Sequence, residues 1–282
     1  MKAAPFEYLR ASTVDEAVGA LGPGAVVLAG GQSLVPLLNL RSRRPELVVD
    51  VSRLPLTDIG TTGTGSLALG ALTRLRAAET SPVVARTLPL LAEALTCVGH
   101  VSVRNRGTVG GSVAHADPAA ELPAVFLASD AVFTARSADG VRTIAAGDFF
   151  RGPHRTALGP GELLTAIHVP LPPPGTRHGV AELSRRPNDL AVTAVFTSVT
   201  LARGVVADAR IAVAGAAPTP IRARAAEDLL RGEAPSPDLL AAAADAAAAA
   251  TDPADDLHAP AAYRRDMTAV LTRRALRQAV AE

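Results

Sequence analysis

The spacing of apolar residues alternates between short extended runs and longer helical patterns. Extended runs predict strands at residues 6–9, 25–29, 46–51, 66–70, 131–135, 141–144, 162–170, 191–201 and 206–216. Helical spacing predicts helices at 14–21, 34–40, 72–79, 82–98, 122–127, 222–230, 237–251 and 263–280, with a break at Pro89 in the fourth. Both periods occur along the whole chain, which indicates a globular protein built from sheets and helices.

Proline and glycine mark where these elements end. Gly63-Thr64-Gly65 and Asp139-Gly140 each separate two strand-like runs and predict hairpin turns. Residues 171–175 read Leu-Pro-Pro-Pro-Gly, a stiff segment that cannot continue a strand. We therefore place a domain boundary there, between a first domain at 1–172 and a second at 176–282.

Composition and charge exclude several classes of function. The chain has 282 residues, is 48% hydrophobic and carries a formal net charge of +1, so nothing in its charge favours nucleic acid or an anionic membrane. No apolar run is long enough to span a bilayer. The N-terminus lacks the apolar core of a signal peptide, so we expect a cytoplasmic protein without a membrane span.

The rare residue types narrow the chemistry further. Cys97 is the only cysteine, which excludes an internal disulfide, an iron–sulfur cluster and a structural zinc site held by cysteines. Lys2 is the only lysine, so a P-loop is excluded. No short metal-ligand spacing occurs among the histidines, and we expect no metal site; they are His100, His115, His154, His168, His178 and His258.

A dense group of small residues stands out at positions 104–121. Its glycines and alanines leave the backbone bare, so the backbone can approach a ligand closely and direct N–H groups at it. Thr108 and Ser112 add hydroxyl groups, and Asp117 and Glu121 follow as acceptors. Donors followed by acceptors suit a nucleotide, whereas a lone pair of glycines would more simply be a turn. The stretch therefore predicts a ligand-binding loop.

A second glycine segment lies upstream. The apolar run 25–29 is followed by Gly30-Gly31, and Ser33 precedes a helical pattern. A strand, two glycines and the start of a helix form a reasonable receptor for a pyrophosphate, although the same pattern alone also fits a tight turn. The dinucleotide fingerprint G-x-G-x-x-G is absent here, so a Rossmann site is not supported.

Together the two segments resemble a known family. Nineteen consecutive positions, Asn105 to Pro123, match in residue type the second FAD-binding segment of the flavoprotein subunits of molybdenum hydroxylases. These are the medium subunits of aerobic carbon monoxide dehydrogenase and its relatives, which are also similar to the middle segment of xanthine dehydrogenase. Ala29-Gly30-Gly31-Gln32-Ser33-Leu34 resembles the first FAD segment of the same family.

The resemblance implies a fold and a set of cofactor contacts. The family fold is α+β: a two-part FAD-binding domain of the p-cresol-methylhydroxylase type, with subdomains here at about 1–55 and 56–172, followed by a small C-terminal domain of sheet and helices. Carried over position by position, the FAD-binding residues are Ala29, Gly30, Gly31, Gln32, Ser33, Leu34, Thr108, Gly110, Gly111, Ser112, His115, Asp117, Glu121 and Leu164. No catalytic side chain is implied.

The implied function is electron transfer within an oxidoreductase complex. An iron–sulfur small subunit would deliver electrons from a molybdenum-cofactor large subunit to FAD, which passes them to an external acceptor. The alternatives are a self-sufficient FAD-dependent oxidoreductase and a non-catalytic subunit with a vestigial FAD fold. One departure concerns the flavin contact: relatives often carry a lysine just before an Arg-Arg pair, whereas Ala181 and Glu182 stand near Arg185-Arg186 here.

Overall fold

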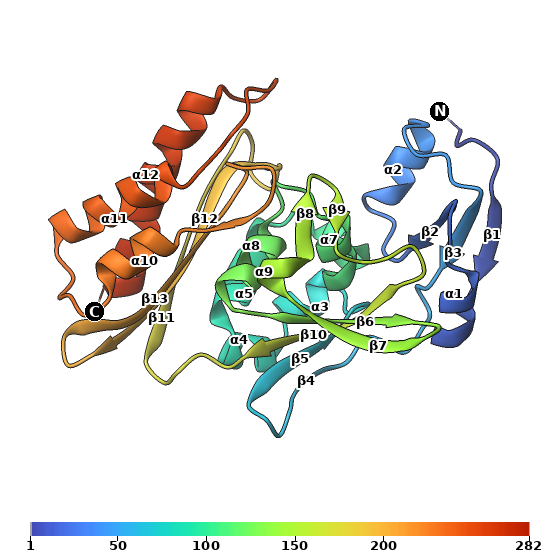
Figure 1. The fold of residues 1–282 in the computed structure, drawn as a ribbon, viewed down its shortest axis with the longest axis horizontal. Helices are drawn as coiled ribbons and strands as arrows, with labels where there is room; N and C mark the ends of the chain where they lie inside the picture. Colours follow the sequence, from blue (N-terminus) through green and yellow to red (C-terminus); the bar gives the residue numbers. More distant parts are fainter. Residues whose placement is uncertain (1, 282) are drawn as a thin grey trace.

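The computed structural model describes residues 2–281 and begins with a small parallel sheet. Its strands are β1 (Glu7–Arg10), β2 (Ala25–Leu28) and β3 (Leu47–Asp50), paired in the order β1-β3-β2, with helices α1 (Val14–Ala20) and α2 (Leu34–Asn39) as crossovers. Thr13 caps α1 by accepting a hydrogen bond from the Glu16 N–H at 3.1 Å. Figure 1 shows this unit at the end of the molecule that carries the N-terminus.

The middle of the chain forms a five-stranded antiparallel sheet in the order β4-β5-β10-β6-β7. The strands are β4 (Ile59–Thr61), β5 (Ser66–Gly70), β6 (Val132–Ser137), β7 (Gly140–Ala145) and β10 (Leu163–Pro170). The predicted turns at 63–65 and 139–140 are confirmed, since they join β4 to β5 and β6 to β7. The aromatic rings of Phe126, Phe133 and Phe149 fill the core against this sheet.

Short helices cover this sheet and link its strands. They are α3 (Leu75–Glu79), α4 (Pro82–Thr87), α5 (Pro89–Cys97), α6 (Val101–Arg106), α7 (Val109–His115), α8 (Glu121–Ala128) and α9 (Ala146–Phe149), followed by a hairpin of β8 (Phe150–Gly152) and β9 (Arg155–Thr156). The break predicted at Pro89 is confirmed, because α5 begins there. The expected loop at 104–121 is wrong in part, since most of that stretch is helical.

The C-terminal part is an antiparallel sheet with helices on one face. Strands β11 (Thr176–Ser184), β12 (Ala191–Ala202), β13 (Val205–Ala214) and β14 (Ile221–Arg222) pair in this order, and α10 (Arg224–Leu230), α11 (Pro237–Ala249) and α12 (Ala261–Val280) follow. A side chain at Gly179 would lie 2.0 Å from the Ala275 carbonyl oxygen, so β11 and α12 are in direct backbone contact. Figure 1 shows these helices on the far side from α5 and α8.

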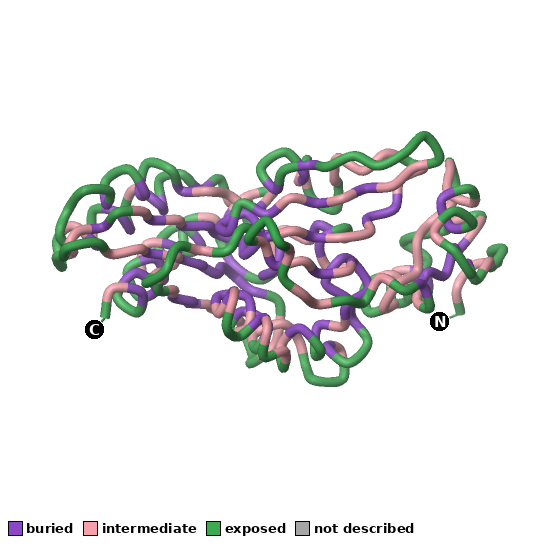
Figure 2. The backbone as a smooth tube through the Cα atoms, turned by 90° about the horizontal axis from the view of Figure 1, so that it is seen from below, coloured by how far each residue is buried: buried purple, intermediate pink, exposed green. Residues whose placement is uncertain are grey.

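The two faces of this sheet explain the unbroken apolar run 191–201. Phe196 and Ala194 point into the core shared with α5 and α8, whereas Val195 and Val199 pack with the C-terminal helices. A sheet buried on both faces needs apolar residues at successive positions instead of alternate ones. In Figure 2 buried backbone accordingly runs through the middle of the molecule, while most of the N-terminal unit is exposed or of intermediate exposure. None of the helices in residues 2–281 is long and apolar enough to cross a membrane.

Candidate functional site

The two glycine segments lie against each other in the fold. A side chain at Gly30 would come within 2.3 Å of the Arg106 carbonyl oxygen and 2.8 Å of the Gly107 Cα. A side chain at Gly111 would be 3.8 Å from the Ala29 Cβ. Glycine at position 30 therefore lets the loop after β2 touch the α6–α7 region, and Gly111 lies at ordinary contact distance from Ala29. The structure thus brings together the two segments that the sequence singled out, although they are far apart along the chain.

The loop after β2 offers unpaired backbone donors. The N–H groups of residues 30–33 form no hydrogen bond with any of residues 2–281. Gly31 has a positive φ of 74°, which turns these groups out of the direction of the strand. Successive free N–H groups in a turn suit an anion such as a pyrophosphate. Ala29 precedes this loop, and Leu34 begins the helix that follows it.

The N–H groups of the α7 glycines are engaged within the protein, and the expected contact of these residues with FAD stays a prediction. The Gly110 N–H donates to the Ala71 carbonyl at 2.8 Å, and the Gly111 N–H donates to the Thr108 hydroxyl at 3.0 Å. A side chain at Gly110 would lie 2.6 Å from the Ala71 oxygen. Ser112 also donates its N–H internally, to the Thr108 carbonyl at 3.0 Å. These N–H groups are therefore not free for a ligand, and the glycines serve close packing.

Beyond α7 the chain presents polar groups at a sharp turn. Ala116 ends α7 with a positive φ of 49°, and Asp117 Oδ1 accepts a hydrogen bond from the Ala119 N–H at 2.9 Å. His115 lies half-buried beside His154. Burial and this neighbouring ring lower the pKa of His115 below its ordinary range.

A buried and a half-buried carboxyl group lie where the middle helices meet the C-terminal sheet. Glu121 begins α8 and is 5% exposed, and burial, together with the negative charge of Glu182, raises its pKa to about 8. Burial likewise raises the pKa of Glu182 to about 7, and its Oε2 atom has no hydrogen-bond partner among residues 2–281. Burial raises the pKa of the nearby Cys97 thiol to about 11, with smaller contributions from both glutamates, so this thiol is not a reactive one. Strongly perturbed carboxyl groups are common at functional sites.

Leu164 is placed differently from the other candidates. It belongs to β10, is 5% exposed and packs in the core of the five-stranded sheet opposite Ala135. The structure therefore gives it a packing role, and its apolar contact with a cofactor stays a prediction.

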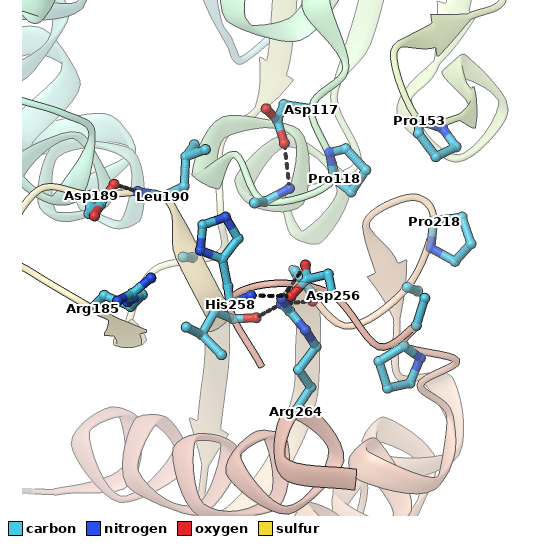
Figure 3. A pocket seen from close by; sticks show the side chains of 17 residues that line it. Asp117, Pro118, Pro153, Arg185, Asp189, Leu190, Pro218, Asp256, His258 and Arg264 are labelled. Atoms are coloured by element: carbon cyan, nitrogen blue, oxygen red, sulfur yellow. Dashed lines mark hydrogen bonds and ion pairs between the residues drawn. The ribbon is translucent and has the colours of Figure 1, made fainter. Parts of the chain in front are cut away.

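A pocket of about 380 Å³ opens between the α7–α8 turn and the C-terminal domain. Figure 3 shows Asp117 and Pro118 on one side of it and Asp256, His258 and Arg264 on another. Its volume is in the range of small-molecule sites. The pocket adjoins the glycine segments through Asp117, so the candidate site extends to the C-terminal domain.

The floor of this pocket is fixed by a buried arginine. Arg264 is 5% exposed, donates to the carbonyl oxygens of Val192 and Gly215, and pairs with Asp256 at 2.6 Å. The guanidinium lowers the pKa of Asp256 to about 2. Sequence analysis did not assign Arg264 to the site, because an arginine in an amphipathic helix is the ordinary pattern of a solvated face.

Comparison with known proteins agrees with this arrangement. Residues 4–172 match the family model described as the FAD binding domain in molybdopterin dehydrogenase, and residues 179–279 match the CO dehydrogenase flavoprotein C-terminal domain. The chain belongs to the flavoprotein subunits of the molybdenum hydroxylase family. The resemblance stated from the two glycine segments is thereby confirmed, together with the α+β fold that it implied.

The alignments with individual relatives cover nearly the full length of both proteins. The 6-hydroxypseudooxynicotine dehydrogenase complex subunit alpha of Paenarthrobacter nicotinovorans is 41% identical, over 99% of this chain and 96% of its own length. The carbon monoxide dehydrogenase medium chain of Hydrogenophaga pseudoflava is 38% identical, over 97% and 96%. The solved carbon monoxide dehydrogenase of that organism superimposes with a TM-score of 0.96 at 40% identity, over 99% of this chain and 98% of that one.

These findings establish the general function. The protein is an FAD-binding subunit of a molybdenum hydroxylase-type oxidoreductase, and the reading as an electron-transfer subunit fits better than a self-sufficient flavin enzyme. The residues present fit the cofactor, since free N–H groups follow β2 and hydrogen-bond acceptors follow α7. FAD supplies the redox chemistry of such a subunit, while the protein supplies binding and electrostatics.

Proposed function

We propose that this subunit binds FAD with its pyrophosphate at residues 29–34 and passes electrons from an iron–sulfur partner to an external acceptor. The observation that supports this placement is the set of four successive N–H groups at 30–33 that have no hydrogen-bond partner within residues 2–281. The segment with Thr108, Gly110, Gly111 and Ser112 forms the opposite wall. Its N–H groups are already bonded, so it contributes a close surface and hydroxyl groups instead of backbone donors.

The acceptors of the site suit the sugar-like part of the cofactor. Asp117 and Glu121 follow α7, and Glu121 is buried with a raised pKa, so a hydroxyl donor beside it would relieve an unfavourable environment. His115 lies next to this turn. We place the flavin ring toward the pocket that Asp117 shares with the C-terminal domain. Without a lysine beside Arg185, the second domain would contact the ring through the residues that line this pocket.

A ligand series tests the pyrophosphate placement. We expect FAD bound to the purified chain to be displaced by ADP, which shares the pyrophosphate, and riboflavin to bind far more weakly. Gly30→Ala places a methyl group against the Arg106 carbonyl, so it should weaken FAD binding by about tenfold or more. Gly63→Ala is the matched control, because nothing lies within 4 Å of the added atom. Equal FAD affinity in the two variants would refute the placement.

The partners follow from the named relatives. Three relatives are named as medium chains or subunits, of carbon monoxide dehydrogenase, glyceraldehyde dehydrogenase and nicotine 6-hydroxylase, and a fourth is named as a subunit of a dehydrogenase complex. We propose a small iron–sulfur subunit and a large molybdenum-cofactor subunit as its partners. The test is anaerobic reduction of the bound flavin: electrons should arrive when both partners and their substrate are present. Reduction by a small organic substrate with this chain alone would favour the self-sufficient alternative.

We further propose a cytoplasmic location and two structural domains, 1–172 and 176–282. The Pro-rich segment 171–175 lies between β10 and β11 and belongs to neither strand. The two parts share one apolar cluster, in which Phe126 and Phe196 both take part. Separately expressed chains 1–172 and 176–282 should therefore co-purify, and cell fractionation should recover the protein with cytoplasmic markers. Failure of the two chains to associate would argue against this division.

A further inference from the structure

Two histidines and an aspartate meet beside the turn that follows α7. His115 ends α7, Asp117 lies two residues later, and His154 occupies the turn between β8 and β9. One ring nitrogen of each histidine and one carboxylate oxygen of Asp117 lie within 4.8 Å of one another. The two imidazole rings are 4.7 Å apart and inclined by 39°. Sequence spacing did not reveal this group, because His154 is far from His115 and Asp117 in the sequence. The β8–β9 hairpin brings it beside them only in the folded chain.

The backbone is shaped to bring these side chains together. His154 has a positive φ of 55°, and its N–H donates to the Ala116 carbonyl at 2.9 Å. Ala116 itself has a positive φ of 49°. Ala116 and His154 therefore both adopt the left-handed backbone conformation, and they are in direct contact. This conformation costs free energy for residues other than glycine and is often found at ligand sites. The hairpin is therefore held against the α7–α8 turn in a defined position.

Hydrogen bonds leave the ligand atoms of this group available. His154 Nδ1 lies 3.2 Å from the His115 carbonyl oxygen. A histidine that donates from one ring nitrogen to a carbonyl presents a lone pair at the other nitrogen, as metal-binding histidines usually do. The Asp117 Oδ1 atom accepts from Ala119, and no hydrogen bond to any of residues 2–281 engages its Oδ2 atom.

We propose that His115, Asp117 and His154 form a binding site for a divalent transition-metal ion. Two imidazoles and one carboxylate match the ligand types of zinc and of related first-row ions, with the remaining positions open to water. His154 is exposed and the other two residues are half-buried, so an ion can enter from solvent. Bound metal would fix the β8–β9 hairpin to the end of the glycine segment.

This inference goes beyond the proposed function and does not depend on it, since it requires neither flavin nor partner subunits. His115 and Asp117 are shared with the proposed FAD site, whereas His154 is not among the FAD residues. His154→Asn therefore separates the two assignments. His100→Asn is the matched control, because His100 is exposed and lies outside the group.

The experiment uses the full chain, stripped of metal and flavin and titrated with Zn²⁺ by calorimetry and with Co²⁺ by visible absorption. We expect one Zn²⁺ per chain in the wild type and in His100→Asn. In His154→Asn the affinity should fall by about tenfold or more, with loss of the Co²⁺ bands and of the thermal stabilisation by Zn²⁺. Absence of binding by the wild type, or equal binding by His154→Asn, would overturn the proposal.

A parallel titration with FAD keeps the two proposals distinguishable. His154→Asn should keep wild-type affinity for FAD while its Zn²⁺ affinity falls, which supports the metal site. Loss of FAD affinity in this variant with unchanged Zn²⁺ affinity would overturn the metal site. Failure of the wild type to bind FAD would count against the proposed function alone.

Discussion

Replacing Glu121 by glutamine should make the flavin-free protein more stable, and increasingly so as the pH rises. Glu121 is 5% exposed, and burial is the main cause that raises its pKa from 4.5 to about 8. The folded state therefore holds a proton that the unfolded state releases above about pH 4.5. The stabilising contribution of this group is complete below the unfolded pKa and is lost as the pH rises toward the folded pKa.

The size of the effect follows from the shift. One pKa unit corresponds to about 1.4 kcal/mol. Most of the loss of unfolding free energy falls between the unfolded pKa of 4.5 and the folded pKa of about 8. Raising the pH from 5 to 7 should cost the wild type about 2.5 kcal/mol relative to Glu121→Gln, if other groups titrate alike in both proteins. A hydroxyl of bound FAD that donates to Glu121 would favour the charged form, so the difference should shrink on addition of FAD.

Urea unfolding at constant ionic strength measures this difference at several pH values. The quantity of interest is the free energy of unfolding of Glu121→Gln minus that of the wild type. Glu233→Gln is the control, because Glu233 is an exposed carboxylate in the segment between α10 and α11. If the advantage of Glu121→Gln stays constant from pH 5 to pH 7, the assignment of a raised pKa to this buried carboxyl is wrong.

Three further outcomes follow from the packing. Gly110→Ala forces a methyl group to within 2.6 Å of the Ala71 oxygen, so we expect a loss of about 1–3 kcal/mol of unfolding free energy in urea titrations, together with weaker FAD binding. Arg264→Met removes the donor to the carbonyl oxygens of Val192 and Gly215, which should cost about 1–3 kcal/mol by the same assay. The pKa of Asp256 is lowered to about 2, so its contribution to stability should persist above about pH 4 and disappear as the pH falls toward 2; acid titration of Asp256→Asn, which lacks this dependence, measures it.

Much of the fold could be predicted from apolar spacing alone. The run 191–201 and the helical patterns at 237–251 and 263–280 correspond to β12, α11 and α12. The helix over Val109–His115 was not predicted, because glycines lower helix propensity. Its stability comes from tertiary contacts and from the Thr108 cap, and neither is visible in local sequence.

The candidate site was predictable only where its residues are contiguous. The two glycine segments could be read as ligand-binding because small residues, hydroxyls and carboxylates cluster within them. Arg264 and His154 could not be found in this way. Each reaches the site from a distant element, and its position depends on backbone partners such as Gly215 and Ala116.

The contact between Gly30 and Gly107 shows why the first segment needs glycine at position 30 before any ligand is considered. A side chain on Gly30 would overlap the backbone at Arg106 and Gly107, so the two segments could not approach. Once the two segments are in contact, their backbones differ in the N–H groups that remain for a ligand. The N–H groups at 30–33 have no partner in the described part of the chain, whereas those of Gly110 and Gly111 are bonded within the protein. In the proposed FAD placement the first segment would donate hydrogen bonds to the pyrophosphate, and the second would provide the close surface beside it. Substitutions that remove N–H groups should accordingly matter in the first segment, and substitutions that add volume should matter in both.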